Sequence, residues 1–455
     1  MKLAKIFSDN MILQCDKPIN IFGTGDGDFQ IDFYGHSFYG KSKNGKWSIA
    51  LPKMSAGGPF EMTVTLNGKT TVIHNILIGE VWIAGGQSNM EFTISNIKND
   101  GGTPCDLHEI PTIRFYKLEI DDEFHYNEES CNWKECNSEN IDNFSAVAYY
   151  FALKLSREIN KPIGIISANK GASRVESWTP REYILNTEFD ISPDEKHGDA
   201  ATYPFNKPGL LFENKILPVI PYTVRSVIWY QGESDRGCLE TKYYRKLFEN
   251  MVNSWKTYFG DELSFITVQL TIFGEGMPQE NDPEKLANYE DTAPTNNWAL
   301  IREQQEIAAK EIKGVYMVTT MDVGGRNAIH PLNKQPVGDR LALAAENIFY
   351  GKKCEYCGPI YQNASVKGST IIISFSHAES GLKLIDKIED LFICGKDGIY
   401  KSATATILDN KLVASCDEIP EPKGLKYAFV NYSDVSLFNE EGFPASPFRT
   451  KNLIL

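Results

Sequence analysis

Short apolar strands alternate with helices between residues 77 and 350, and this alternation limits the possible folds more than any other feature. The expected strands are 81–84, 163–168, 224–230, 263–270 and 314–320, and the expected helices are 144–158, 240–258, 298–313 and 335–350. Parallel strands need a crossover connection, commonly a helix, so this order predicts a parallel sheet covered on both faces. The segments 95–143 and 181–215 lack such periodicity and are expected to form irregular insertions and loops around the sheet.

Both ends of the chain have the composition of β structure. In residues 1–76, β-branched and aromatic segments are separated by turns such as Asn44-Gly45 and Asn67-Gly68. Residues 351–455 return to short strands and turn-rich sequence. Three domains are therefore predicted: an N-terminal β-sandwich-like module (1–76), a central α/β domain with insertions (77–350) and a C-terminal β module (351–455).

Charge and composition exclude several classes of partner. The 455 residues carry a formal net charge of −14 at pH 7, and no cluster of Lys and Arg offers a basic face for nucleic acid. No apolar run approaches the length of about 18 residues that spans a bilayer, so no membrane partner is expected. The composition is compatible with a homo-oligomer as well as with a monomer.

The first residues and the cysteines bear on the compartment. No uninterrupted apolar segment of the kind found in secretory signals opens the chain, so a cytoplasmic protein is expected. The nine cysteines are odd in number and irregularly spaced, which does not suit a disulfide framework. Cys354 and Cys357 form a C-x-x-C without a second pair or a nearby His, so two thiols are favoured over zinc, and no cofactor is expected.

The stretch 85–92, Gly-Gly-Gln-Ser-Asn-Met-Glu-Phe, follows the first expected strand of the central domain. The glycine pair permits a sharp turn, which would present Ser88 where the strand gives way to a helix. A serine there has free backbone N–H groups nearby, as a nucleophile that generates an oxyanion requires. The alternative is that Ser88 only caps the helix.

Three further strands end in polar loops. The second is followed by 169–174, with Gly171 and Arg174; the third is followed by Gln231 and Glu233; the fifth leads to Asp322 and His330. Ligands of an open parallel sheet bind beyond the carboxyl ends of its strands, so these loops are expected to converge.

His330 is the best candidate for a general base. Of the seven histidines, it alone follows a central strand and precedes a helix of the expected sheet. A neutral imidazole can take the serine proton and return it to a leaving alcohol. The alternative is a histidine that tethers its loop.

Four segments resemble the sialate O-acetylesterase family of the SGNH hydrolases. They are Gly-Gln-Ser-Asn-Met (86–90), Lys-Gly-Ala-Ser-Arg-Val-Glu-Ser-Trp (170–178), Tyr-Gln-Gly-Glu-Ser-Asp (230–235) and Ile-His-Pro (329–331). The two ends of the chain also resemble those of the family, so the likeness covers nearly all of it. It implies a flavodoxin-like three-layer α/β sandwich with a parallel sheet, flanked by the two β modules, that removes O-acetyl groups from sugars without a metal or organic cofactor.

The resemblance also implies roles for individual residues. Ser88 matches the nucleophile and His330 the general base. The N–H groups of Ser88 and Gly171 match the oxyanion hole, and Gln231 stands where many relatives have an Asn whose side chain donates to the oxyanion. Asn89, beside the nucleophile, is expected to support the pocket.

The residue that orients His330 departs from the family pattern. Relatives often carry an Asp three or two positions before the His, where this chain has Asn327 and Ala328. Asp322 is favoured because it begins the same loop, with Glu233 or a backbone carbonyl as alternatives. Glu233 is otherwise expected to support the pocket floor.

Two basic side chains complete the expected site. Arg302 is predicted to pair with Glu233. Arg174 either binds the carboxylate of a sialic acid or pairs with an acid such as Glu176.

A small acetylated sugar is the expected substrate, with 9-O-acetylated sialic acid preferred. Acetylated xylo-oligosaccharides or other plant glycans are the alternative. A non-catalytic sugar-binding protein is a third reading, and the presence together of Ser88, Gly171, Gln231 and His330 argues against it.

Overall fold

The computed structural model describes residues 1–455 except 186–201, 237–240, 242, 275–282, 289–296 and 451–455. The chain forms two compact units, each described by itself below. The first contains Met1–Gln231 and Leu247–Phe265, and the second contains Gly232–Lys246 and Ile266–Leu455. Helices and large sheets occur together, so the protein is mixed α/β, as the sequence predicts.

The first unit is built on a long central strand, β8 (Lys69–Gly86). Its buried second half pairs in parallel with β11 (Ile163–Asn169) on one side and β12 (Ser226–Tyr230) on the other. The register places Gly86 opposite both Asn169 and Tyr230, so the three strands end flush at one edge. The loops that follow them therefore leave the sheet side by side, as the sequence predicts for the first three strand ends.

The sheet has a further parallel strand that the sequence did not reveal. β9 (Ile110–Lys117) lies beside β11, and β10 (Trp133–Cys136) adds antiparallel to β9. The prediction that 95–143 is an irregular insertion is therefore wrong for these two strands, while most of the segment around them is irregular. Pro111 and the buried Arg114 interrupt the apolar pattern of β9, and the Arg114 guanidinium is satisfied by the carbonyls of Asn75 and Pro111.

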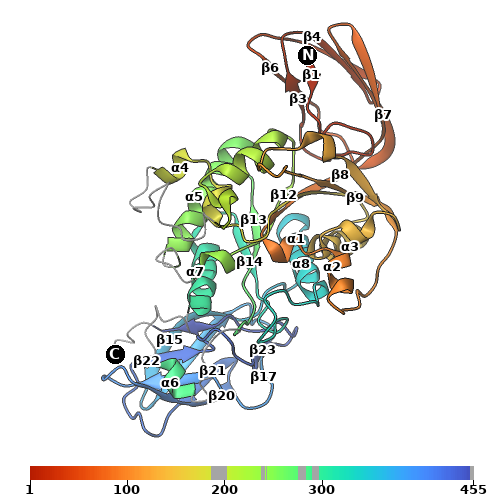
Figure 1. The fold of residues 1–455 in the computed structure, drawn as a ribbon. Helices are drawn as coiled ribbons and strands as arrows, with labels where there is room; N and C mark the ends of the chain where they lie inside the picture. Colours follow the sequence, from red (N-terminus) through yellow and green to blue (C-terminus); the bar gives the residue numbers. More distant parts are fainter. Residues whose placement is uncertain (186–201, 237–240, 242, 275–282, 289–296, 451–455) are drawn as a thin grey trace. The chain divides into compact units, whose positions relative to one another are not determined.

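Some of the N-terminal strands belong to this same sheet, and the others form a separate sheet. One sheet has β1 (Lys2–Leu3), β3 (Ile19–Thr24) and β6 (Lys46–Leu51); the other has β4 (Gly27–Phe33), β5 (His36–Ser42) and β7 (Gly57–Leu66). β7 pairs with the first half of β8, and β2 (Ile12–Gln14) pairs in parallel with Leu77–Gly79. Figure 1 shows β8 running from these strands into the sheet that contains β9 and β12. The predicted boundary at 76/77 thus falls inside one strand.

Helices of the first unit begin at or near the loops that leave the sheet. They are α1 (Ser88–Glu91), α2 (Ile94–Asn99), α3 (Ala146–Ile159), α4 (Glu182–Leu185) and most of α5 (Tyr244–Phe259). α3 is capped by Ser145, whose hydroxyl accepts from the Ala148 N–H at 3.2 Å, and ends at Asn160 in a left-handed conformation. Its aromatic and aliphatic face is buried, as expected of a helix covering a sheet.

The second unit carries the remaining central elements and the C-terminal strands. β13 (Phe265–Val268, all but its first residue in this unit) neighbours β14 (Val315–Val318). The helices are α6 (Pro283–Ala287), α7 (Asn297–Glu311) and α8 (Gln335–Tyr350), and α8 matches the predicted 335–350. α8 ends at Gly351, which has the left-handed φ of +69° that a helix C-terminus favours, so the predicted boundary at 350/351 coincides with a helix end.

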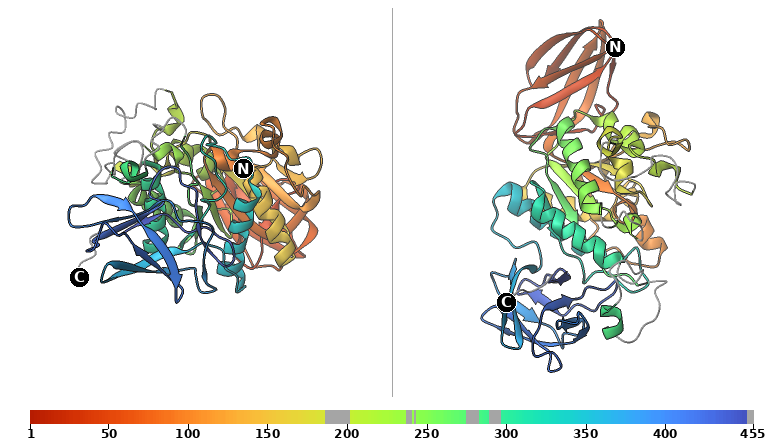
Figure 2. Two further views of the ribbon diagram at one scale, coloured as in Figure 1. Left: turned by 90° about the horizontal axis from the view of Figure 1, so that it is seen from below. Right: turned by 90° about the vertical axis from the view of Figure 1, so that its left-hand side faces the viewer.

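The C-terminal strands form two four-stranded sheets that share an apolar core. One has β15 (Ile360–Lys367), β16 (Thr370–Ser376), β20 (Thr404–Leu408) and β21 (Lys411–Ser415); the other has β18 (Leu391–Cys394), β19 (Tyr400–Ser402), β22 (Gly424–Tyr427) and β24 (Phe448–Arg449). β17 (Leu382–Leu384) pairs with β23 (Leu437–Asn439). Ile373 and Leu412 of the first sheet pack with Ile393 and Leu425 of the second. Figure 2 shows these strands, in blue, gathered into one module.

Glu80 is a fully buried acid at the start of the apolar half of β8. Arg225 donates to both of its carboxylate oxygens, at 2.7 and 3.1 Å, and Gln14 and Lys161 add hydrogen bonds at 2.9 and 3.2 Å. Burial by itself raises the pKa of Glu80, but the hydrogen bonds and charge of Arg225 outweigh it and lower this pKa to about 2. The ion pair ties β8 to the segment that leads into β12.

In the described part of the chain, no helix is long and apolar enough to cross a membrane.

We expect Arg225→Met to destabilise the protein by about 3 kcal/mol, because it leaves the Glu80 carboxylate buried without its main partner. Urea unfolding at neutral pH measures this loss. Lys41→Met is the control, since Lys41 and Asp28 form an exposed pair and its removal should change stability by less than about 0.5 kcal/mol.

The same pair predicts how stability depends on pH. Because folding lowers the pKa of Glu80, its contribution is complete above the unfolded pKa of about 4.5 and is lost as pH falls toward about 2. Arg225→Met should reduce the slope of stability against pH in this range. Equal slopes in the variant and the wild type would contradict the assigned role.

Candidate active site

Ser88 lies at the flush edge of the sheet, immediately after β8. Gly86 has φ +133°, and a Cβ there would lie 2.1 Å from the Tyr230 carbonyl oxygen, so only glycine fits. The Gln87 N–H donates to this same oxygen at 2.9 Å, which fixes the turn. Gln87, not Ser88, is the N-cap of α1, so the alternative that Ser88 caps the helix is wrong. Ser88 is the first helical residue and is partly exposed.

Gly171 lies beside Ser88. A Cβ added to Gly171 would be 3.6 Å from the Ser88 Cβ and 3.1 Å from Glu91 Oε2. The Gly171 N–H donates to Glu91 Oε2 at 2.6 Å, a short bond typical of a charged acceptor. The structure therefore brings Ser88 and Gly171 together, as expected, and places a carboxylate on the N–H predicted to bind an oxyanion.

Glu91 was not singled out from the sequence. Its signal is its place in α1, one helical turn after Ser88, so that both side chains lie on the same side of the helix. Lys215 is buried nearby and donates to the Leu118 carbonyl. Burial lowers the pKa of Lys215 to about 8, while the charges of Glu119 and Glu91 oppose this decrease. Glu91 thus lies next to Gly171 and close enough to Lys215 to affect its pKa.

Gln231 follows β12 and is fully buried. Its side-chain N–H groups donate to Gln87 Oε1 at 3.2 Å and to the Ser173 carbonyl at 3.1 Å. In this arrangement Gln231 links the loops after β8 and β11. Donation to an oxyanion would require the exchange of one of these two bonds, so this role stays a prediction.

Arg174 and Asn89 are also buried in the first unit, with 5% and 2% of their surface exposed. The Arg174 backbone N–H donates to Asn206 Oδ1 at 2.9 Å. Neither carboxylate oxygen of Glu176 has a hydrogen-bond partner among the described residues, so Arg174 does not pair with Glu176, and pairing with another acid stays a prediction. Recognition of a substrate carboxylate by Arg174 stays a prediction.

Asp322 and His330 belong to the second unit. Both carboxylate oxygens of Asp322 accept from Arg340, at 2.7 and 2.6 Å, which fixes the start of the loop against α8. His330 is partly exposed in the segment before α8. Ser88 and His330 lie in different units, so their pairing stays a prediction. The orientation of His330 by Asp322 also stays a prediction.

Arg302 and Glu233 do not pair as predicted. The Arg302 guanidinium is fully buried and donates to the carbonyls of Thr271, Val430 and Asn431. Burial lowers the pKa of Arg302 to about 9 with no acid opposing it, so Arg302 holds backbone segments together. A cation that the Glu233 charge does reach is Lys334, whose pKa is lowered to about 7 by burial while the Glu233 charge opposes the decrease.

Ser88 lies beside the first-turn N–H groups of α1 and beside Gly171, and serine-dependent acyl transfer requires a serine next to such donors. Comparison with known proteins agrees with this class. Residues 78–345, more than half of the chain, match the model of the family described as "Carbohydrate esterase, sialic acid-specific acetylesterase". The chain belongs to this family and is a carboxylic ester hydrolase.

Individual relatives show how far the similarity extends. The chain is 26% identical over 440 residues to a sialate O-acetylesterase from Pongo abelii, covering 90% of this chain and 82% of that one. It is 25% identical over 382 residues to the sialate O-acetylesterase of Mus musculus, covering 74% and 70%. The crystal structure of a carbohydrate acetylesterase from Xanthomonas citri aligns with a TM-score of 0.86 at 28% identity, covering 99% of both chains.

We expect Gly171→Ala to lower kcat for an aryl acetate about tenfold, because the added Cβ points at Glu91 Oε2 and Ser88 and displaces the N–H from its place. KM should change less than about twofold, since the loss falls on the transition state. Steady-state kinetics measures both constants. Gly57→Ala is the control, because its Cβ would meet nothing closer than 3.7 Å. An unchanged kcat would exclude Gly171 from the oxyanion hole.

Proposed function

We propose that the protein removes O-acetyl groups from sugars through an acetyl-enzyme formed on Ser88. The observation that carries this proposal is the position of Ser88 at the start of α1, with the Gly171 loop beside it at the flush edge of the sheet. Such a serine is accessible and adjacent to N–H groups that have no intrahelical acceptor. His330 acts as the general base. The fold that best suits this chemistry is the three-layer SGNH sandwich that the sequence resembles.

The reaction proceeds in two steps. Ser88 Oγ attacks the acetyl carbonyl carbon while His330 takes the hydroxyl proton, and the tetrahedral intermediate then breaks its bond to the sugar oxygen. His330 returns the proton to that oxygen, which frees the sugar alcohol. Water, activated by His330, attacks the acetyl-Ser88 ester, and acetate leaves as Ser88 Oγ regains a proton.

The oxyanion of each intermediate is bound by the N–H groups of Ser88 and Gly171. A donor of this kind typically contributes about 3–4 kcal/mol to the transition state. Since Glu91 Oε2 accepts from the Gly171 N–H in the structure, the oxyanion has to replace this carboxylate oxygen before it can use that donor. In this exchange the Gly171 N–H gives up its hydrogen bond to the Glu91 carboxylate and forms one to the oxyanion.

The proposed substrate is 9-O-acetylated sialic acid, because the curated relatives are named sialate O-acetylesterases. Acetylated xylo-oligosaccharides or other plant glycans are the second candidate, because the structural relative that covers 99% of the chain is described only as a carbohydrate acetylesterase. Action on small sugars in the cytoplasm is part of the proposal.

We expect Ser88→Ala to lower acetate release from aryl acetates and acetylated sugars by at least about 10³-fold, because it removes the hydroxyl that carries the acetyl group in the proposed mechanism. Labelling by a fluorophosphonate should be lost with it. Ser48→Ala, a change at an exposed position of β6, should behave as the wild type in both assays. Retention of activity and labelling in Ser88→Ala would overturn the proposal.

A further inference from the structure

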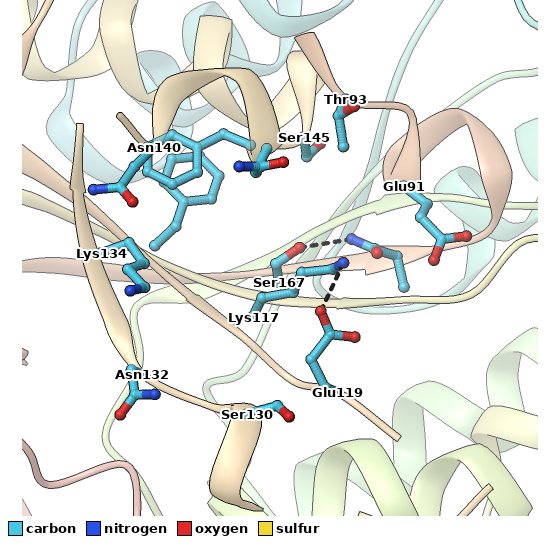
Figure 3. Close-up of a pocket in the computed structure, with 14 residues that line it drawn as sticks. Glu91, Thr93, Lys117, Glu119, Ser130, Asn132, Lys134, Asn140, Ser145 and Ser167 are labelled. Atoms are coloured by element: carbon cyan, nitrogen blue, oxygen red, sulfur yellow. Dashed lines mark hydrogen bonds and ion pairs between the residues drawn. The ribbon is translucent and has the colours of Figure 1, made fainter. Parts of the chain in front are cut away.

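A cavity of about 170 Å³ opens in the first unit beside Glu91, with room for roughly one sugar ring. Figure 3 shows its lining residues coming from α1, from the strands β9, β10 and β11, and from the loop before α3. The position, lining and charge of the cavity together indicate what it binds.

The cavity adjoins the site of acyl transfer. Glu91 lines it and also accepts the hydrogen bond of the Gly171 N–H, and Gly171 lies against Ser88. Asn169, the last residue of β11, lines the cavity two residues before Gly171. A ligand in the cavity would therefore have one end at Glu91, next to the proposed nucleophile.

The lining suits a polyhydroxylated ring. It combines side-chain amides and hydroxyls with two aromatic rings, Phe115 and Phe144, which stack with centroids 4.0 Å apart and planes 10° from parallel. Asn169 and Ser167 are buried lining residues, and the Asn169 amide donates to Ser167 Oγ at 2.8 Å, which leaves the amide oxygen as an acceptor. Hydrogen-bonding groups around an apolar wall are what a sugar requires.

The two lysines that line the cavity differ in their ion pairing. Lys117 forms an ion pair with Glu119 at 2.7 Å, whereas Lys134 has no ion-pair partner among the described residues. In Figure 3, Glu91 and Lys134 lie on opposite sides of the view. The cavity thus has an available cation at the end away from Ser88.

We propose that this cavity is the sugar subsite of the esterase and that Lys134 binds the carboxylate of an acidic sugar. In 9-O-acetylated sialic acid, the ester and the carboxylate lie at opposite ends of the molecule, which matches Glu91 at one end of the cavity and Lys134 at the other. This inference rests on the proposed function. It names Lys134, a residue that the sequence motifs do not include, as a determinant of specificity.

The test is Lys134→Met, which keeps the length of the side chain and removes its charge. KM for 9-O-acetylated sialic acid should rise about tenfold with kcat unchanged, as expected for the loss of one charge-assisted hydrogen bond at an exposed group. KM for acetylated xylo-oligosaccharides and for an aryl acetate should stay within about twofold. Raising the salt concentration should shrink the difference from wild type on sialic acid, because exposed charges are screened.

Lys53→Met is the matched control, since Lys53 is an exposed lysine outside the cavity, and it should leave all three substrates unchanged. An unchanged KM for the sialic acid in Lys134→Met would overturn the inference. So would an equal rise for acidic and neutral sugars, or a fall in aryl acetate turnover. Activity that survives Ser88→Ala would instead overturn the proposed function, so the two failures are distinguishable.

Discussion

The backbone contact between the ends of β8 and β12 is the constraint on which the first unit's site depends. Gly86 packs against the Tyr230 carbonyl so closely that no side chain fits, and this carbonyl accepts the Gln87 N–H. On the other side, the Gly86 carbonyl accepts the Lys170 N–H at 3.1 Å. These two bonds align the loops that carry Ser88 and Gly171. The parallel ladder behind them, in which Gly86 lies opposite both Asn169 and Tyr230, fixes the register of the three strand ends.

Charged side chains lie at both ends of the parallel ladder. Glu80 and Arg225 are paired inside the unit near the start of the parallel ladder, where they hold β8 to the segment before β12. At the other end of β8, Glu91 Oε2 accepts the Gly171 N–H, the donor that the proposed mechanism assigns to the oxyanion. The site therefore already binds an anionic oxygen in the resting structure. A tetrahedral oxyanion would find the Gly171 N–H already oriented, but it would first have to displace the Glu91 carboxylate oxygen from it.

The sequence predicted the elements whose apolar pattern is continuous and missed those whose pattern is interrupted. The segments 163–168 and 335–350 correspond to β11 and α8, but β9 was missed because Pro111 and Arg114 break its pattern. At the site, the motif around Ser88 predicted the turn and the neighbouring Gly171 correctly. Contacts that depend on tertiary packing could not be predicted from the sequence. Arg302, for example, donates to backbone carbonyls distant in sequence and does not pair with Glu233. The cavity beside Glu91 could not be predicted either, because its lining comes from β9, β10 and β11, which are distant in sequence.

Acid-quenched mass spectrometry tests the central claim most directly. Wild-type protein mixed briefly with an excess of an activated acetyl ester should carry one acetyl group on the peptide that contains Ser88, and a longer incubation after the ester is consumed should remove it. His330→Ala should slow both its formation and its loss. An acetyl group on another residue, or turnover with no acetylated peptide at any time, would contradict the account.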